Sequence, residues 1–212
     1  LFEEAVQAGV TIEKIFALEN YRDQLASFPQ TVWVSEDILL DLADSQTPQG
    51  IVAVVQKEEV GQADFSQGKL LFLEDVQDPG NVGTIIRTAD AAGFTGVIVS
   101  DKSADIYSLK TLRSMQGSHF HLPIYRMSSQ ALLKETKEAD IPVLATTLSK
   151  DSVDYRELPP IENFVLVMGN EGQGISPLMA ESADQLVHIS MKGQAESLNV
   201  AVAAGILIFH LS

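Results

Sequence analysis

The side chains of this chain that could carry chemistry lie in three polar stretches far apart in the sequence. They are a guanidinium, a carboxylate, two amides and a hydroxyl, at Arg87, Glu171, Asn81, Asn199 and Ser197. A guanidinium suits a phosphate group or a developing negative charge, while a carboxylate and amides can orient a polar ligand. We expect these residues to form one ligand site if the fold brings the three stretches together.

The elements that must position these residues alternate between strands and helices from Lys69 onward. Apolar runs indicate strands near residues 70–73, 96–100, 120–125, 142–146, 164–168 and 185–190. Helical patterns such as 108–116 and 129–139 fall between most of them. This alternation predicts an α/β fold with a parallel sheet covered on both faces. Ligands in such sheets bind beyond the carboxyl ends of the strands, where the three polar stretches fall.

The first polar stretch predicts a helix with Asn81 as its N-cap and Gly93 as its C-terminal stop. The buried face of this helix is formed by Val82, Ile85, Ile86 and Ala89. Arg87 lies off that face, one turn into the helix. Judged from this helix alone, Arg87 could equally be a ligand-binding residue or a surface arginine that pairs with Asp90 or Asp78.

A dinucleotide-binding turn is a rival interpretation of the same stretch, with Asp101 at the end of the next strand as the ribose-binding acid. Gly80 and Gly83 supply only a G-x-x-G spacing, and the G-x-G start of that motif is missing. The sequence therefore favours another kind of ligand.

The second and third stretches combine glycines with polar side chains. Gly169, Gly172 and Gly174 let the backbone approach a ligand closely, and Glu171 could orient a ligand or cap a helix. A helix is expected to start near Pro177. In the third stretch, serine and asparagine in the first turn of a small-residue helix are ordinarily caps. The same side chains can still face a ligand.

Composition narrows the class of protein. The chain has 212 residues, no cysteine and a net charge of −15, and the longest apolar run, 200–209, is about half of a membrane span. Disulfides and thiolate metal sites are excluded, and we expect a cytoplasmic protein without membrane contact. The acidic balance argues against a nucleic-acid partner unless a local basic patch, a dimer groove or an upstream segment binds the phosphates. The chain starts without Met, so we expect residues upstream.

We predict a small α/β unit over residues 1–57, a polar linker over 58–68 and a larger domain over 69–212. His119 and His121 flank Phe120 on a predicted strand, which invites a metal interpretation. No third ligand is apparent nearby in the sequence, so we expect no metal site.

The three stretches, in this order and at these separations, resemble the three motifs of the SpoU (TrmH) family of RNA ribose 2'-O-methyltransferases, within the SPOUT class. The resemblance covers about residues 69–212. One departure is Ser190, which stands where the family usually has proline before methionine; the exchange should loosen this loop without removing a side chain expected to act in chemistry.

The resemblance implies a SPOUT-type, mostly parallel sheet with a C-terminal trefoil knot, preceded here by an N-terminally truncated RNA-binding domain. It also implies S-adenosylmethionine as cofactor, rRNA or tRNA rather than DNA as substrate, and a homodimer. Arg87 would be the catalytic arginine, supported by Asn81, Glu171, Ser197 and Asn199. The cofactor contacts would be Gly169, Ile189 and Leu198, with Leu166, Met168, Asn170 and Met191 as neighbours.

Two other functions stay open at this point. One is a SPOUT-like module that binds RNA or cofactor without turnover, an alternative that the acidic balance keeps open. The weaker one is an NAD-dependent oxidoreductase built on the G-x-x-G turn.

Overall fold

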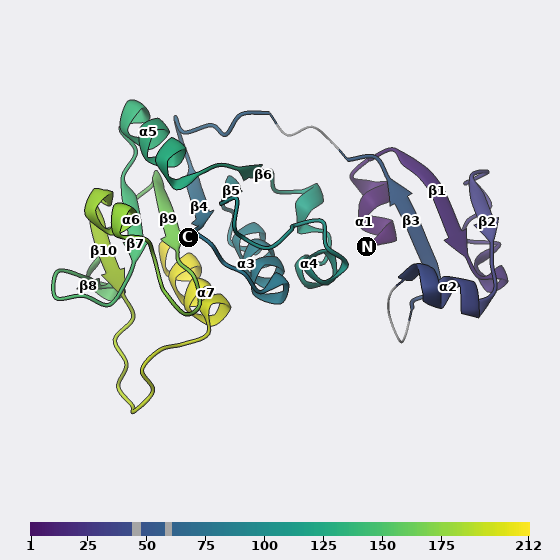
Figure 1. Ribbon diagram of the computed structural model, residues 1–212. Helices are drawn as coiled ribbons and strands as arrows, with labels where there is room; N and C mark the ends of the chain where they lie inside the picture. Colours follow the sequence, from purple (N-terminus) through teal and green to yellow (C-terminus); the bar gives the residue numbers. More distant parts are fainter. Residues whose placement is uncertain (44–47, 58–60) are drawn as a thin grey trace. The chain divides into compact units, whose positions relative to one another are not determined.

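The computed structural model describes residues 1–43, 48–57 and 61–212 (Figure 1). The chain divides into two compact units, Leu1–Glu59 and Val60–Ser212. Of the predicted linker, residues 58–60 lie outside the described residues, and 61–68 contain no helix or strand.

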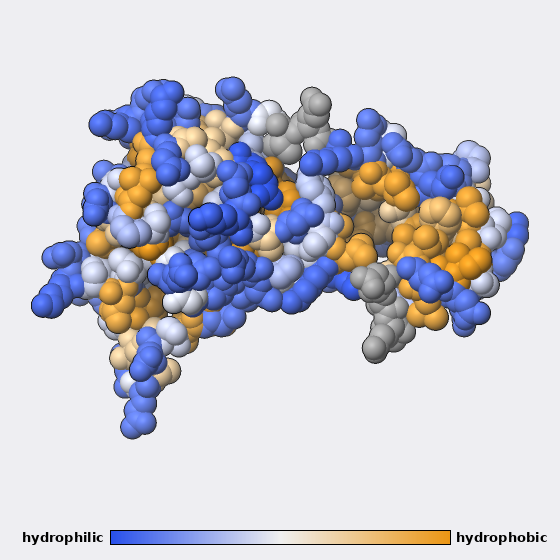
Figure 2. All heavy atoms as spheres, viewed as in Figure 1, coloured by the Kyte–Doolittle hydropathy of each residue, from blue (hydrophilic) through white to orange (hydrophobic). Residues whose placement is uncertain are grey.

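The first unit is a three-stranded sheet with helices. Its elements are α1 (Phe2–Gln7), β1 (Ile12–Ala17), the 3-10 helix η1 (Glu19–Tyr21), β2 (Thr31–Trp33), α2 (Glu36–Ala43) and β3 (Ile51–Val55). Strand β1 lies in the middle, parallel to β2 and antiparallel to β3. Ile15, Ala17 and Leu25 form its small core. Apolar side chains also remain at the surface, among them Val32, Ile38 and Val54, and Figure 2 shows hydrophobic residues gathered on the face of this unit turned to the viewer.

The second unit is built on a seven-stranded sheet in the order β6-β5-β4-β9-β7-β10-β8. Its strands are β4 (Lys69–Leu73), β5 (Gly96–Val99), β6 (Ile124–Arg126), β7 (Val143–Thr146), β8 (Val153–Asp154), β9 (Phe164–Met168) and β10 (Gln185–His188). Its helices are α3 (Pro79–Ala91), α4 (Leu109–Met115), η2 (Ser118–Phe120), α5 (Ser129–Ala139), η3 (Tyr155–Glu157), α6 (Pro177–Ser182) and α7 (Val200–Leu211). Each pair of neighbouring strands is parallel, as predicted.

The apolar composition of the central strands follows from their burial on both faces. Leu71 and Leu73 of β4 pack on one face, against helices α3, α4 and α7. Leu70 and Phe72 of the same strand pack on the other face, against α5 and α6. The alternation of side chains along each strand therefore supplies both halves of the core.

Three local expectations are wrong. Helix α3 begins at Pro79 with Asp78 as its N-cap, because proline suits the first helical position and the Asp78 carboxylate accepts the Asn81 amide at 2.9 Å. The strand predicted over 120–125 shrinks to β6, since η2 occupies the chain before it and places His119 and His121 outside any strand. Helix α7 starts at Val200, so Ser197 and Asn199 lie before its first turn instead of in it, although Asn199 is its N-cap, as expected.

Within the described residues, no helix is long and apolar enough to cross a bilayer.

Close packing of α3 on α4 depends on a glycine, which gives a prediction about stability. A Cβ at Gly83 would lie 2.6 Å from the Thr111 carbonyl oxygen and 3.0 Å from the Met115 nitrogen. Neither backbone atom can move without displacing α4, so Gly83→Ala should lower the free energy of unfolding by about 1–3 kcal/mol. The measurement is urea denaturation followed by circular dichroism.

The matched control is Gly205→Ala in α7, where an added Cβ meets only Thr88 Cγ2, at 4.0 Å. This change should be neutral or stabilise the protein by up to about 1 kcal/mol, because alanine favours helix more than glycine does. Equal destabilisation by both substitutions would contradict the packing explanation.

Candidate active site

The three polar stretches meet at the carboxyl edge of the sheet. The first follows β4, the second follows β9, and the third follows β10 and leads into α7. Strands β4 and β9 are direct neighbours, and only β7 separates β9 from β10. Parallel pairing places the ends of these strands on the same side, so segments about ninety residues apart in sequence come together.

The loop after β9 is closed on itself. Asn170 and Gly174 exchange two backbone hydrogen bonds of 3.0 and 2.9 Å, and the Asn170 side-chain oxygen accepts the amides of Gly172 and Gln173. A Cβ at Gly169 would overlap the backbone of Gly174, so this glycine is required by the loop itself. Gly174 has a φ of +70°, a left-handed conformation that glycine adopts readily.

Glu171 ties this loop to the start of α3. Its carboxylate accepts hydrogen bonds from the Gln77 and Asp78 amides at 3.2 Å each and from Asn81 Nδ2 at 3.1 Å. Partial burial raises the pKa of the Glu171 carboxyl, but the hydrogen bonds from Asn81 and the two amides outweigh it and leave that pKa below its ordinary value. The carboxylate therefore stays charged at neutral pH.

Asn81 is also hydrogen-bonded to the third stretch. Its Oδ1 atom accepts a hydrogen bond of 3.1 Å from Asn199 Nδ2. Asn199 in turn is the N-cap of α7, and its Oδ1 accepts the Ala201 and Val202 amides. The three predicted site residues Glu171, Asn81 and Asn199 thus form one hydrogen-bonded chain, which we call the motif bridge.

Arg87 is not part of the motif bridge. It follows Asn81 by six residues, which in an α-helix is a rotation of about 240° and a rise of about 9 Å. Its guanidinium is exposed and, within the described part of the chain, has no hydrogen bond or ion pair. Ser197 is also exposed and unpaired in the described residues.

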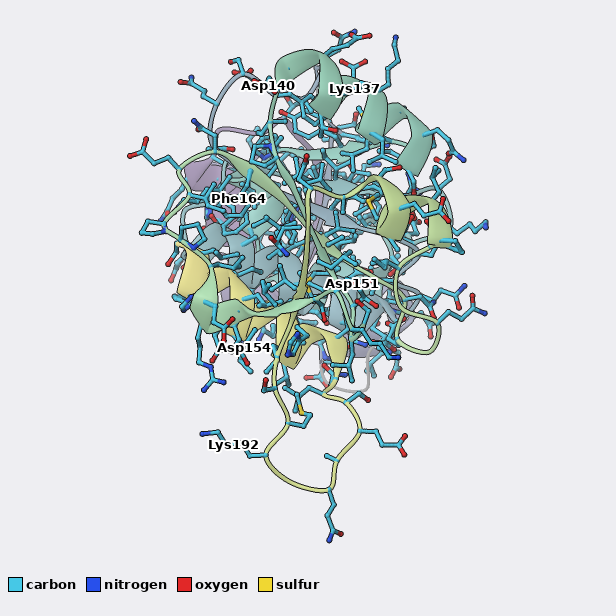
Figure 3. All side chains as sticks on the ribbon, turned by 90° about the vertical axis from the view of Figure 1, so that its left-hand side faces the viewer. Lys137, Asp140, Asp151, Asp154, Phe164 and Lys192 are labelled. Atoms are coloured by element: carbon cyan, nitrogen blue, oxygen red, sulfur yellow. The ribbon has the colours of Figure 1, made fainter. Side chains whose placement is uncertain are left out.

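The predicted cofactor contacts fall into two groups. Leu166 and Met168 are core residues of β9, with side chains at most 2% exposed, so their side chains pack in the protein interior. Ile189, Met191 and Leu198 lie on the loop between β10 and α7, where their side chains are partly exposed. This loop extends from the body of the unit, with Lys192 pointing outward (Figures 1 and 3).

The base of that loop is held by polar side chains at the edge of the sheet. Ser190 Oγ lies 3.3 Å from His188 Nε2, and His188 Nδ1 lies 3.0 Å from Ser152 Oγ. Arg156 first, and then the Ser190 hydroxyl, hold the pKa of the neighbouring Asp154 carboxyl below its ordinary value. Ser190 therefore supplies contacts that proline could not make.

The residues of the metal and dinucleotide interpretations have other surroundings than those interpretations require. His119 stacks on Phe120, with ring centroids 3.9 Å apart, and burial first, then His121, lower the pKa of His119 to about 4. His121 lies 3.4 Å from Asp90. Among the residues that the structure describes, no cluster of three metal-ligating side chains occurs. Gly83 lies within α3 and packs against α4, so it serves helix packing.

Sequence reasoning missed Glu74, which is only 3% exposed at the end of β4. Its side chain accepts hydrogen bonds from Ser176 and Ser129. A carboxylate that directly follows a buried strand was the available signal, because burial of such a group requires partners.

The motif bridge predicts how the Glu171 pKa responds to mutation. Asn81→Ala removes the largest contribution that lowers this pKa, so the pKa should rise toward that of a free glutamate. The check is NMR titration of the Glu171 carboxyl carbon, with Gln173→Ala as the control, since no hydrogen bond to Glu171 comes from that side chain. An unchanged Glu171 pKa in Asn81→Ala would contradict the bridge.

The lowered pKa of Glu171 also determines how the free energy of unfolding depends on pH. A carboxyl whose folded pKa is depressed stabilises the folded state above its unfolded pKa, and this contribution disappears as the pH falls through the folded pKa. The difference in stability between the unmutated protein and Asn81→Ala should therefore be present at pH 7 and shrink in acid.

Comparison with known proteins gives a consistent result. The model of the SpoU rRNA Methylase family matches residues 68–209. The 23S rRNA (guanosine(2553)-2'-O)-methyltransferase RlmP of Bacillus subtilis (strain 168) is 41% identical over 213 residues, which span 100% of this chain and 85% of RlmP.

Solved structures agree in fold. The AdoMet-bound rRNA methyltransferase from Sinorhizobium meliloti has a TM-score of 0.89 and 33% identity, over 99% of this chain and 82% of that one. The SpoU methyltransferase AviRb from Streptomyces viridochromogenes has a TM-score of 0.85 and 28% identity, over 99% of this chain and 84% of that one. The family match, the identity to RlmP and the shared fold together show that the chain belongs to the SpoU rRNA methylase family.

Proposed function

We propose that this chain transfers a methyl group from S-adenosylmethionine to a ribose 2'-hydroxyl of 23S rRNA. The observation that carries the proposal is the motif bridge, which joins all three motifs at one edge of the sheet. The name of RlmP and the AdoMet-bound relative from Sinorhizobium meliloti support the substrate and the cofactor. The chain is therefore an RNA ribose 2'-O-methyltransferase.

The residues present fit S-adenosylmethionine. Ile189, Met191 and Leu198 supply partly exposed apolar side chains that suit an adenine ring and a methionine chain. Gly169, Leu166, Met168 and Asn170 line the end of β9 and would contribute mainly through their backbone. When bound, the cofactor supplies a methyl group on a positively charged sulfur.

Arg87 is the proposed catalytic arginine. An exposed guanidinium without a protein partner in the described residues can bind the phosphate next to the target ribose and stabilise negative charge on the 2'-oxygen. Guanidinium groups stay protonated in proteins, so the hydroxyl proton passes to a phosphate oxygen or to water. Asn81, Glu171, Ser197 and Asn199 shape the site around the two substrates.

The position of Arg87 supports a homodimer. Because Arg87 lies on another face of α3 than Asn81, it would act at the cofactor of a second copy. Helix α7 offers a surface for such a contact, with Val202 and Phe209 53% and 59% exposed. A two-fold contact would then complete each active site with a residue of the partner.

Three further assignments follow from family membership. Residues 1–57 form an RNA-binding domain, 58–68 a linker and 69–212 the catalytic domain, in agreement with the two compact units. The C-terminal segment forms the trefoil knot that the family resemblance implies, and its last helix, α7, packs against α3. The enzyme works in the cytoplasm, where ribosomal RNA is modified.

The activity is tested with purified protein, S-adenosylmethionine carrying a labelled methyl group, and unmodified 23S rRNA. We expect label in 2'-O-methyl nucleosides after digestion. Cofactor binding without labelled product on any cellular RNA would instead indicate a binding module, and binding of NAD alone would overturn the proposal.

Arg87→Lys tests the role of the arginine. Lysine keeps the charge but cannot form the two parallel hydrogen bonds, so kcat should fall by roughly 10²–10³-fold while the cofactor Kd stays unchanged. Arg113→Lys, another exposed arginine on the neighbouring helix α4, is the control and should keep kcat within about twofold. Activity of Arg87→Lys close to that of the unmutated enzyme would rule out the bidentate contact.

Mixed dimers test whether Arg87 acts across the interface. Arg87→Ala and Gly169→Ala should each be inactive alone, the first for lack of the arginine and the second because its loop cannot close. If Arg87 serves the partner, an equal mixture should recover about a quarter of the activity, since one site in half of the dimers is intact. Subunit exchange in the mixture is monitored by sedimentation. If the subunits exchange and no activity is recovered, action of Arg87 on the partner is contradicted.

A further inference from the structure

Glu74 is a buried carboxylate whose hydrogen-bond partners come from two other elements. It directly follows β4 and is 3% exposed. Its Oε1 accepts hydrogen bonds from Ser129 Oγ at 2.6 Å and Ser176 Oγ at 2.8 Å, and its Oε2 accepts the Ser176 amide at 2.8 Å. A buried charge is tolerated only with such partners.

Two of these hydrogen bonds hold the end of the loop that follows β9. Ser176 is the N-cap of α6, and its hydroxyl also accepts the Met179 amide at 3.1 Å. The Ser176 hydroxyl is thereby fixed between Glu74 and α6. The third bond, from Ser129, goes to the start of α5 and does not touch this loop.

The next residue, Asp75, holds the beginning of the same loop. Its backbone is left-handed, with φ of 58°, and its amide and carboxylate both bond to Ser100 Oγ, at 2.8 and 2.6 Å. The Asp75 carbonyl oxygen accepts a hydrogen bond of 2.8 Å from Asn170 Nδ2. Two consecutive residues after β4 thus bind the first and last residues of the segment Asn170–Ser176.

We propose that Glu74 is a positioning residue for methyl transfer: with Asp75, it sets the shape of the segment Asn170–Ser176 before the cofactor binds. The inference rests on the proposed function, in which Gly169 and Asn170 contact S-adenosylmethionine. A wall that is already ordered costs less conformational entropy on binding, so the benefit appears as cofactor affinity. Glu74 itself touches neither substrate.

Both carboxyl oxygens of Glu74 are needed, because together they accept three hydrogen bonds. Glutamine keeps the size of the side chain but has one acceptor oxygen instead of two, so it cannot accept all three hydrogen bonds in this geometry. Glu74→Gln should therefore loosen the loop without opening a cavity. Ser176→Ala removes the hydroxyl that binds Glu74 and so releases the same end of the loop. This variant replaces Glu74→Gln in the test if Glu74→Gln does not fold.

The experiment compares the unmutated full chain with Glu74→Gln, Ser176→Ala and Ser129→Ala. Calorimetry gives the Kd for S-adenosylmethionine, kinetics with 23S rRNA give kcat and KM, and thermal unfolding reports stability. We expect Glu74→Gln to weaken cofactor binding about tenfold, and Ser176→Ala several-fold, with KM for the cofactor rising more than kcat falls. Ser129→Ala, the matched control, removes a bond to the same carboxylate and should leave the Kd within about twofold.

Two results would overturn the inference. One is a Kd of Glu74→Gln or Ser176→Ala equal to that of the unmutated enzyme. The other is an equal loss of affinity in Ser129→Ala and Ser176→Ala, which would indicate general destabilisation. Failure of the unmutated chain to bind S-adenosylmethionine is a separate result, and it would overturn the proposed function together with this inference.

Discussion

The site depends on one chain of hydrogen bonds, from Glu171 through Asn81 to Asn199. Each bond alone contributes only about 1 kcal/mol, and these side chains are partly exposed to water. Their importance is geometric, because they join the ends of β4 and β9 to the start of α7. The loops after β4 and β9 are also joined by the hydrogen bonds of Glu74 and Asp75, but the bond from Asn199 to Asn81 extends the connection to the start of α7. The backbone bonds to Glu171 and the capping bonds from Asn199 anchor both ends of this chain in regular structure.

Sheet and helices were largely predictable because their signals are local. The apolar runs 70–73 and 164–168 identified the two central strands, and the turn before Pro177 identified the start of α6. The N-cap of α3 was misassigned to Asn81 although Pro79, a typical first helical residue, pointed to Asp78. The strand predicted over 120–125 was only partly right, because β6 starts at Ile124 and the 3-10 helix after Gly117, whose φ is 94°, occupies the chain before it.

The candidate site was predictable only in part because its geometry is non-local. The motif resemblance predicted that Asn81, Glu171 and Asn199 share a site, and hydrogen bonds join their side chains. It also placed Arg87 there, although the spacing of six residues from Asn81 puts the two on different faces of α3. Glu74 was missed because its partners Ser129 and Ser176 are 55 and 102 residues away. Such pairs depend on which strand ends become neighbours, which local patterns do not encode.

An enzyme with a net charge of −15 must bind RNA locally, against its overall charge. Within residues 87–126, basic side chains outnumber acidic ones, with Arg87, Lys102, Lys110, Arg113 and Arg126 against Asp90, Asp101 and Asp105. Two of these bases are paired with acids outside the segment, Lys102 with Asp75 and Lys110 with Asp78. Arg87 has no partner within the described residues and is therefore the base of this segment best able to bind a phosphate. We therefore expect few phosphate contacts, an affinity that depends only modestly on salt, and selectivity through the fit of the target ribose.

The central claim, methylation of a ribose in 23S rRNA, is tested most directly by mapping ribose 2'-O-methylation across all RNA of cells that carry or lack this chain. The account predicts one 23S rRNA position whose methylation disappears with the chain and returns when the unmutated chain is restored, but not when Arg87→Ala is supplied. An identical methylation map in both cells, or a lost site confined to transfer RNA, would contradict it.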